Sequence, residues 1–221
     1  MSRRHHWAAL LPSRECEYDA LPMSVTPDGF VFPLRDGTRV LLRPVRGEDR
    51  PRIQVGLARL SPQSRYLRFF SGMSELTEKQ LRYLTEVDQF DHVAWGALDP
   101  AAPGLPGLAM ARFAREEEDA TVAELAVVVL DSVQGRGLGS VMLGVLFLEA
   151  PRCGIRTFRA LVLPENEAVV QWFARLGATV RREPDLCQVD LPIVDDSALP
   201  DTGTARRFAW LLSALRPLLR V

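Results

Sequence analysis

Lysine is nearly absent from this sequence. Lys79 is the single lysine among 27 basic residues, so arginine carries almost all of the positive charge. The chain is therefore a poor candidate for modification at its own lysines. The formal net charge is −1, and a balance so close to zero favours neither nucleic acid nor an anionic membrane surface. We expect no nucleic-acid partner and no membrane partner.

Cysteine and histidine are also scarce, with three residues of each. Cys16, Cys153 and Cys187 form an odd, widely spaced set, which argues against a disulfide framework and for a reducing compartment. No Cys-x-x-Cys or His-x-x-x-His spacing occurs, so we predict no metal site. The pair His5-His6 is the alternative, but two histidines near a terminus are more often simply solvated.

Long apolar runs are missing as well. The longest, Val141–Leu148, is far shorter than the ~20 residues of a membrane-spanning helix. Met1–Leu11 lacks the apolar region of a signal peptide. With 221 residues, of which 47% are hydrophobic and 25% are charged, the chain suits one globular domain with short extensions. These features predict a soluble, cytoplasmic protein.

What the sequence does contain is a glycine-rich stretch, Ser132–Ser140, between two regular segments. The apolar, β-branched run 121–130 before it predicts a strand, and the run 140–152 after it predicts a helix. Glycine allows positive φ and a close approach to the main chain. The start of a helix offers free N–H groups and a positive dipole end to an anion. We therefore infer a phosphate-bearing ligand on residues 134–140.

Three phosphate-binding patterns can be compared with this stretch. A P-loop needs a lysine after its second glycine, and none is present. A dinucleotide-binding fingerprint has the pattern Gly-x-Gly-x-x-Gly. Gly135-x-Gly137 matches its first two glycines, but Ser140 stands in place of the third, and the stretch lies past the middle of the chain. The pattern that remains is Gln134-x-x-Gly137-x-Gly139. A strand–helix turn without any ligand is the alternative interpretation.

The other segments mix strands and helices, which argues for an α+β or mixed α/β fold. Turn signals dominate residues 1–36, which we take as an irregular N-terminal extension before a domain at 37–192. Strands are predicted at 38–43, 92–98, 108–114, 121–130, 156–162, 178–181 and 187–191. Helices are predicted at 48–60, 64–70, 76–87, 140–152 and 166–176.

A polar linker, 193–203, precedes an amphipathic helix at 204–221. Its apolar residues lie on one side and its arginines elsewhere, and Pro217 should bend or end it. Packing on its own domain is the favoured interpretation for this helix. Docking on a second subunit, and so a possible homodimer, is an alternative. Attachment to a membrane surface is another.

The order and spacing of these motifs resemble the Gcn5-related N-acetyltransferase (GNAT) family over residues 38–185. Gln134-x-x-Gly137-x-Gly139 is similar to its pyrophosphate loop, and a later helix opening at Asn166 ends in Gly177-Ala178 as in the family. The segment Leu42–Asp49 and the run Leu60–Phe70 look like the acetyltransferase domain of bacterial protein lysine acetyltransferases. The resemblance implies a central, mostly antiparallel sheet of six to seven strands, with one parallel splayed pair and flanking helices.

The resemblance also implies acetyl-CoA as the cosubstrate, without any metal, and a set of residues that contact it. A strand before the loop offers main-chain groups to the pantetheine arm, and the loop holds the pyrophosphate. In this sequence the implied contacts are Val127, Val128, Val129, Gln134, Gly135, Arg136, Gly137, Leu138, Gly139, Ser140, Asn166 and Phe173. Arg136 is expected either to pair with a phosphate or to point to solvent.

Glu124 is the predicted catalytic base. An amine must lose a proton before it can attack a thioester, because a lysine amine is protonated near neutrality. The resembling lysine acetyltransferases carry their catalytic glutamate at the corresponding place in the strand. We expect an apolar cleft to raise the pKa of Glu124. The alternative is that Glu124 belongs only to the polar face of a half-buried strand.

Phe173 marks a departure from the family. The family often carries at this place a tyrosine that protonates the leaving thiolate, and Phe173 cannot do so. A thiol with a pKa of about 8.5 is a tolerable leaving group without an acid. We expect Phe173 to pack against the cofactor or the core.

The sequence thus predicts an N-acetyltransferase that moves an acetyl group from acetyl-CoA to an amine. A protein lysine is the favoured acceptor, and direct attack in a ternary complex is the favoured mechanism. A small-molecule amine is an alternative acceptor. A non-catalytic acyl-CoA-binding module is a further alternative, and a nicotinamide-dependent oxidoreductase is the least favoured one.

Overall fold

A computed structural model describes residues 23–102, 104 and 106–219 of the chain. His5, His6 and Cys16 lie outside these residues. One sheet of nine strands runs through the described part in the order β1-β2-β3-β4-β5-β6-β7-β9-β8. The strands are β1 (Ser24–Thr26), β2 (Gly29–Pro33), β3 (Arg39–Pro44), β4 (His92–Leu98), β5 (Ala109–Arg115), β6 (Val122–Val129), β7 (Thr157–Val162), β8 (Thr179–Arg182) and β9 (Cys187–Pro192).

The sheet confirms the predicted fold class. Seven neighbouring pairs are antiparallel, and β6 with β7 is the parallel pair. The seven predicted strands correspond to β3–β9. The other two, β1 and β2, lie in residues that we expected to be irregular, and that expectation is wrong. Pro27 and Asp28 form only the turn of a hairpin in which Thr26 pairs with Gly29.

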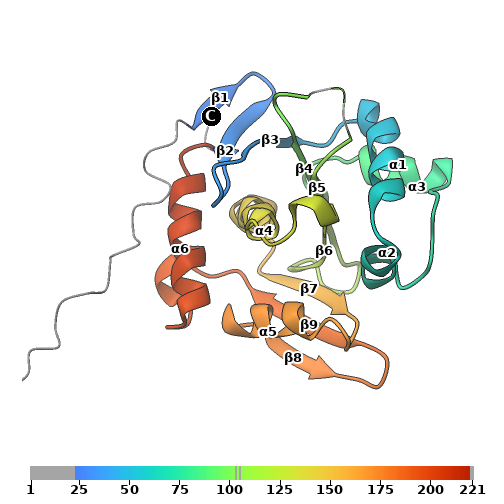
Figure 1. Ribbon diagram of the computed structural model, residues 1–221. Helices are drawn as coiled ribbons and strands as arrows, with labels where there is room; N and C mark the ends of the chain where they lie inside the picture. The colour runs from blue at the N-terminus through green and yellow to red at the C-terminus, as the bar shows by residue number, and fades with distance from the viewer. Residues whose placement is uncertain (1–22, 103, 105, 220–221) are drawn as a thin grey trace, which may run out of the picture.

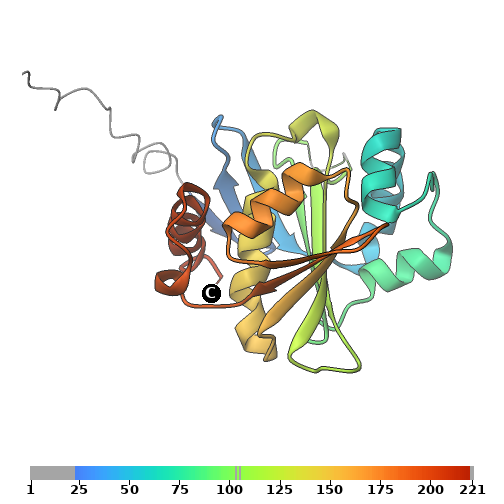
Figure 2. The ribbon, with the colours of Figure 1, turned by 90° about the horizontal axis from the view of Figure 1, so that it is seen from below.

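The helices cover both faces of the sheet (Figures 1 and 2). On one face lie α1 (Arg50–Arg59), α2 (Pro62–Phe69) and α3 (Glu78–Thr85). On the other lie α4 (Leu138–Glu149), α5 (Glu167–Arg175) and α6 (Gly203–Leu215). Short 3₁₀ turns occur at Gly47–Asp49, Asp131–Val133, Ala150–Cys153 and Asp196–Ala198. The larger core lies between α4 and the sheet, with Phe32, Phe113 and Phe158 fully buried in it.

Local sequence signals set several helix ends. Thr77 and Gln80 form a capping box at the start of α3. α5 ends before Gly177, whose φ of +96° is the left-handed conformation typical of a residue just past a helix. α6 ends at Leu215, two residues before Pro217, as a proline that cannot continue a helix requires.

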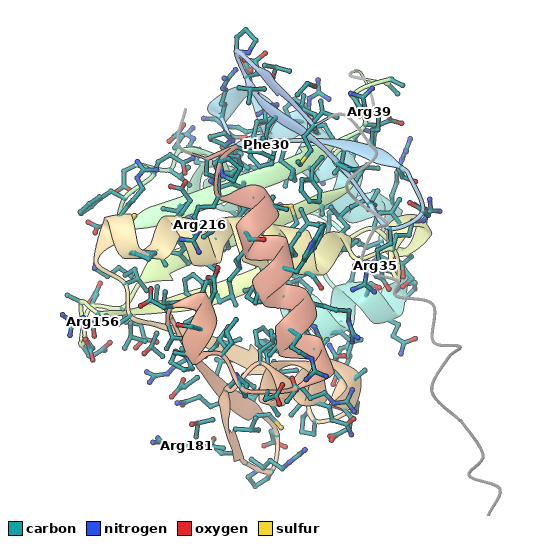
Figure 3. All side chains as sticks on the ribbon, turned by 90° about the vertical axis from the view of Figure 1, so that its left-hand side faces the viewer. Phe30, Arg35, Arg39, Arg156, Arg181 and Arg216 are labelled. Carbon is teal, nitrogen blue, oxygen red and sulfur yellow. The ribbon has the colours of Figure 1, made fainter. Side chains whose placement is uncertain are left out.

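The C-terminal helix packs on its own domain. Phe208, Leu211, Leu212 and Leu215 are buried, and the Phe208 ring meets Phe147 of α4 edge-on at 5.4 Å between centroids. Figure 3 shows α6 crossing over α4. Because this apolar face is already covered within one chain, the structure does not support the possible homodimer through this helix.

The segment expected to be a linker is also tied to the domain. Arg216 Nη2 donates to both carboxylate oxygens of Asp196, each at 2.8 Å. The Thr202 hydroxyl donates to the Arg175 carbonyl at 2.7 Å. Thr202 in addition caps α6 by accepting from the Ala205 N–H. These contacts fix the approach of α6 to α4.

Gly144 permits the close contact between α4 and α6. A Cβ at Gly144 would lie 2.9 Å from Leu215 Cδ1 and 3.6 Å from Leu211 Cδ2. We expect Gly144→Leu to lower the free energy of unfolding by roughly 1–3 kcal/mol, the usual cost of overpacking. Denaturant-induced unfolding measures this change. Gly47→Leu is the control, because a Cβ there meets nothing within 4 Å, and an equal loss in both variants would contradict the assignment.

Candidate active site

The parallel pair β6–β7 opens part of the way along its length. Its register contains only three pairs, Val122 with Thr157, Ala123 with Phe158 and Glu124 with Arg159. β6 continues to Val129 and stays paired with β5 along that whole length. One edge of β6 after Glu124 therefore faces a gap between the two strands. This gap is the splay that the family resemblance predicts.

Main-chain groups of alternate β6 residues point into the splay. Leu130 donates its N–H to the Leu108 carbonyl of the β5 side at 2.9 Å. Since the bonding side alternates along an antiparallel ladder, even-numbered residues of β6 bond to β5 and odd-numbered ones face away from it. The residues whose N–H and C=O groups face the splay are Leu125, Val127 and Val129.

This alternation corrects one expected contact. Val128 was expected to offer main-chain groups to the pantetheine arm together with Val127 and Val129. As an even-numbered residue it bonds to Met110 of β5 instead, and its side chain lines a cavity on the other side of the strand. The main-chain contacts of Val127 and Val129 remain predictions that the strand geometry supports.

The glycine-rich turn leads from β6 into α4 as the sequence predicts. Gly135 and Gly137 have φ of +76° and +91°, a conformation that other residues rarely adopt. Gly137 is the N-cap of α4 and has no side chain to offer to the helix. The first helical N–H groups, those of Leu138, Gly139 and Ser140, have no carbonyl within the helix to bond. They form a suitable cradle for an anionic diphosphate.

Arg136 forms an ion pair while its side chain stays 41% exposed to solvent. Its guanidinium binds the Asp36 carboxylate at 3.1 Å and the Ser132 carbonyl at 2.8 Å. The hydrogen bonds to Asp36 from the Thr38 N–H and hydroxyl hold the pKa of that carboxyl below its usual value, and Arg136 adds to this effect. Arg136 therefore ties the loop to the β2–β3 hairpin, and its role as a phosphate ligand stays a prediction.

Arg35 lies where the sequence suggested no site residue. Its side chain runs along Gly137, and a Cβ on Gly137 would lie 3.4 Å from Arg35 Nε. Figure 3 shows Arg35 beside the N-terminal end of α4. Arg35 was not predicted because residues 1–36 were expected to be an irregular extension. Arg35 is a candidate to bind the phosphate in the role that we had given to Arg136.

Arg35→Ala should weaken the binding of acetyl-CoA without altering the fold. One charge-assisted hydrogen bond to a phosphate contributes about 1.5–3 kcal/mol, so we expect the dissociation constant to rise roughly 10- to 100-fold. Calorimetric titration measures it. Arg181→Ala is the control, because Arg181 is exposed on β8, far from Arg35 (Figure 3). If both variants bound as the wild type does, Arg35 would not be a ligand.

Polar contacts also join the loop to α2. The Asp131 carboxylate accepts from the Ser61 N–H at 2.9 Å and from the Ser61 and Ser64 hydroxyls at 2.7 Å. Burial acts to raise the pKa of Asp131, but these hydrogen bonds outweigh it and lower the pKa. Gln134 donates to the Val129 carbonyl at 3.0 Å and to Ser64 at 3.3 Å. The Ser61-x-x-Ser64 motif thus serves to position the loop.

Glu124 lies on β6 beside the start of the splay, on the strand face opposite to Leu125. Its side chain is 53% exposed and approaches Arg112, with 3.5 Å between Oε1 and Nη2. The apolar cleft that we expected around Glu124 is therefore not present, because an arginine and solvent surround the carboxylate. Its role as the base stays a prediction, supported by its position.

Arg112 is the centre of a polar cluster around Glu124. It donates to the Tyr83 hydroxyl at 3.0 Å and contacts His92 Nε2 at 3.2 Å. Burial first, and then the Arg112 charge, lower the pKa of His92 to about 4, so His92 is neutral at pH 7. Because arginine can only donate, Nε2 accepts and the ring proton lies on Nδ1. No spacing in the sequence indicated this cluster.

An apolar cavity of about 100 Å³ opens on the same face of the sheet as Glu124. Ala126 and Val128 of β6 form part of its floor, and side chains from α1, α2 and α3 form its roof. Arg68, from α2, and Arg112 stand in its wall. The cavity therefore adjoins the strand that borders the splay.

Two predicted contacts lie on α5. Asn166 is the N-cap residue of this helix, and its main-chain carbonyl accepts from the Val169 and Val170 N–H groups. Phe173 is 5% exposed and packs in the core, with its ring 4.9 Å from that of Trp172. Of the two roles given for Phe173, the structure shows core packing. Contacts of Asn166 and Phe173 with a cofactor stay predictions.

Within residues 23–102, 104 and 106–219, no group of three or more His, Cys, Asp or Glu side chains is placed to hold a metal ion. Cys153 and Cys187 are buried free thiols. No helix in this part of the chain is long and apolar enough to cross a membrane.

A splayed strand pair followed by a glycine-rich helix start is the arrangement that the family resemblance implies for acyl-CoA binding, and comparisons with known proteins agree. The model of the acetyltransferase (GNAT) family matches residues 73–178. Acetyltransferase PA5475 of Pseudomonas aeruginosa is 33% identical over 162 residues, which cover 73% of this chain and 87% of that protein. The chain therefore belongs to the GNAT acetyltransferase family, whose members use acetyl-CoA as cosubstrate.

Two further relatives refine this placement. Acetyltransferase Pat of Mycolicibacterium smegmatis is 40% identical over 177 residues, which cover 75% of this chain. The chain spans about half, 51%, of that relative's length. The crystal structure of the GNAT domain of S. lividans PAT superimposes with a TM-score of 0.67 at 30% identity, covering 73% of this chain and 95% of that domain.

Proposed function

We propose that this chain transfers the acetyl group of acetyl-CoA to the side chain of a protein lysine. The observation that carries the proposal is the position of Glu124, which lies at the start of the splay and beside the cavity. The glycine-rich turn, with Arg35 beside it, binds the pyrophosphate. The splay-facing edge of β6 binds the pantetheine arm, so that the thioester lies close to Glu124.

The proposed reaction is a direct attack within a ternary complex. Glu124, directly or through a water, takes a proton from the lysine ammonium. The nitrogen lone pair then attacks the thioester carbonyl carbon, and a C–N bond forms. The N–H of Val127, which faces the splay, donates to the oxyanion. Collapse of the tetrahedral intermediate breaks the C–S bond and releases the CoA thiolate. The nitrogen loses its second proton to solvent, which protonates the thiolate, so that a neutral amide and CoA thiol are the products.

The charges around Glu124 suit this reaction. Arg112 lies 3.5 Å from the carboxylate and fixes its orientation. Neighbouring guanidinium groups also disfavour a protonated amine and so lower its pKa. His92 is neutral and directs Nε2 to Arg112, so it serves to hold Arg112 rather than to act as the base.

A groove on the outer side of α2 supports a protein acceptor. Tyr66 and Phe70 are each 42% exposed there, although they are large and aromatic. The groove also includes the β7–α5 and β8–β9 loops, which contribute the carboxylates of Glu165 and Asp185. Apolar walls with two carboxylates suit a basic peptide segment. The 40% identity with Acetyltransferase Pat adds support for acetyl transfer.

The proposal is tested by incubating the protein with acetyl-CoA and an N-terminally blocked peptide that contains one lysine. We expect mass spectrometry to find a single acetyl group on that lysine. The same peptide with norleucine in place of lysine is the matched control and should stay unmodified. If acetyl-CoA bound but no lysine or small amine were ever acetylated, the chain would be a binding module. Acetylation of small amines alone would leave the fold and the donor correct and the acceptor wrong.

A further inference from the structure

The cavity beside Glu124 has an unusual excess of positive charge for an apolar space. Among the described residues, its lining contains four arginines and one aspartate, with leucine, phenylalanine and methionine side chains around them. The aspartate is Asp49. It binds Arg43 at 2.6 Å and lies 3.7 Å from Arg52. The charges of Arg68 and Arg112 therefore have no carboxylate within the lining to balance them.

Arg68 is the less satisfied of these two arginines. Its Nε is shut off from solvent and has no hydrogen-bond partner among the described residues. Its guanidinium carbon lies 5.0 Å from the centre of the Phe69 ring. Burial first, and then repulsion by Arg112, lower the pKa of Arg68 to about 10, which Glu124 only partly offsets. Arg68 is still a cation at pH 7, and a buried cation is costly unless it is paired.

Arg112 is buried at 8% exposure, and its Nε also has no hydrogen-bond partner among the described residues. Its other nitrogens contact Tyr83, His92 and Glu124. One exposed carboxylate, Glu124, is thus shared between two buried guanidiniums. The wall can accept a second carboxylate, and a planar guanidinium fork matches carboxylate geometry.

We propose that the cavity is a carboxylate-binding site, in which Arg68, assisted by Arg112, holds the carboxylate of a ligand with a short apolar stem. The size of about 100 Å³ and the leucine-rich walls limit the stem to a few methylene groups. The carboxylate belongs either to a dicarboxylic acyl chain on CoA or to a small amine acceptor. The inference rests on the donor part of the proposed function, acetyl-CoA in the splay, because it places this ligand beside the point of transfer. A small amine acceptor would replace the protein lysine of that proposal.

The test compares pairs of ligands that differ only in the carboxylate, by calorimetric titration of the full chain. The donor pair is succinyl-CoA and butyryl-CoA. The acceptor pair, titrated in saturating CoA, is 4-aminobutyrate and butylamine. We expect the carboxylate member of one pair to bind at least about tenfold more tightly, since a charge-assisted hydrogen bond is that strong. The pair that responds identifies the source of the carboxylate.

Variants show whether Arg68 is responsible. We expect Arg68→Leu to abolish the preference and Arg68→Lys, which keeps the charge, to retain part of it. Arg82→Leu, on the exposed side of α3, is the control and should change nothing. Equal binding within both pairs, or a preference that survives in Arg68→Leu, overturns the proposal. If neither CoA thioester binds, the proposed function itself fails and the carboxylate site with it, whereas equal binding within both pairs defeats only the carboxylate site.

Discussion

Replacing Glu124 by glutamine should lower kcat/KM for acetyl transfer about 10²–10⁴-fold, the usual contribution of a general base. Glutamine keeps the size of the side chain and an oxygen that can accept from Arg112, 3.5 Å away, but it cannot take a proton. We therefore expect the dissociation constant of acetyl-CoA to stay within about twofold of the wild type. Steady-state kinetics and calorimetry on the same preparation separate these two effects.

Glu118→Gln is the matched control for this prediction. Glu118 is exposed in the turn between β5 and β6, and its substitution removes the same negative charge. Its activity should equal that of the wild type. If Glu124→Gln also kept its turnover within about threefold, Glu124 would only be part of the polar face of β6. The cluster around Arg112 would then serve to bind substrate rather than to move a proton.

Replacing Asp49 by asparagine should lower the free energy of unfolding by about 3–5 kcal/mol, because it leaves the buried Arg43 unpaired. Both side chains are less than 10% exposed, and two hydrogen bonds of 2.8 and 2.6 Å join them. Asp49 also accepts from the Arg46 N–H at 2.9 Å. This pair fixes the start of α1 to the end of β3 and forms part of the cavity wall.

Two comparisons make the stability prediction specific. Glu48→Gln removes an exposed partner of Arg46, with 3.8 Å between the charged groups, and should cost less than about 1 kcal/mol. The double variant Arg43→Met with Asp49→Leu removes both charges and should recover much of the loss. A loss for Asp49→Asn no larger than that for Glu48→Gln would show that the pair contributes little.

The stability difference between the wild type and Asp49→Asn should depend on pH. Burial opposes the ionisation of Asp49, but the hydrogen bonds from Arg43 and Arg46 outweigh it and lower the pKa of the carboxyl. The pair therefore stabilises the protein fully above the unfolded-state pKa of about 3.9. This stabilisation is lost as the pH falls through the lower pKa of the folded state. The two proteins should differ at pH 7 and converge in acid.

The glycine-rich turn was predictable because its chemistry is local. Positive φ at Gly135 and Gly137, and the free N–H groups of α4, follow from a few adjacent residues. β2 was not predictable, because Pro27 precedes it and Pro33 is its last residue, and both were interpreted as turn signals. Its middle residues, Phe30 and Phe32, are nevertheless at most 1% exposed in the core. A proline at the end of a strand costs little, so it does not exclude one.

The polar parts of the site were less predictable because they depend on contacts between distant segments. Arg136 binds Asp36, which lies 100 residues away in the sequence, and no local pattern indicates that contact. Arg112, Tyr83 and His92 meet only because β4 and β5 pair and α3 packs above them. Position along β6 identified Glu124 as a candidate, but the strand pattern could not show that its neighbour is an arginine.

Binding of acetyl-CoA by the turn at Gly135–Ser140 is the basis of the proposed reaction. Gly137→Val tests it most directly, because valine resists the φ of +91° and its Cβ would lie 3.4 Å from Arg35 Nε. Calorimetric titration of the wild type with acetyl-CoA should give micromolar binding, without any response to NADH. The variant should bind at least about tenfold more weakly. Equal binding by both proteins, or none by the wild type, would contradict the account.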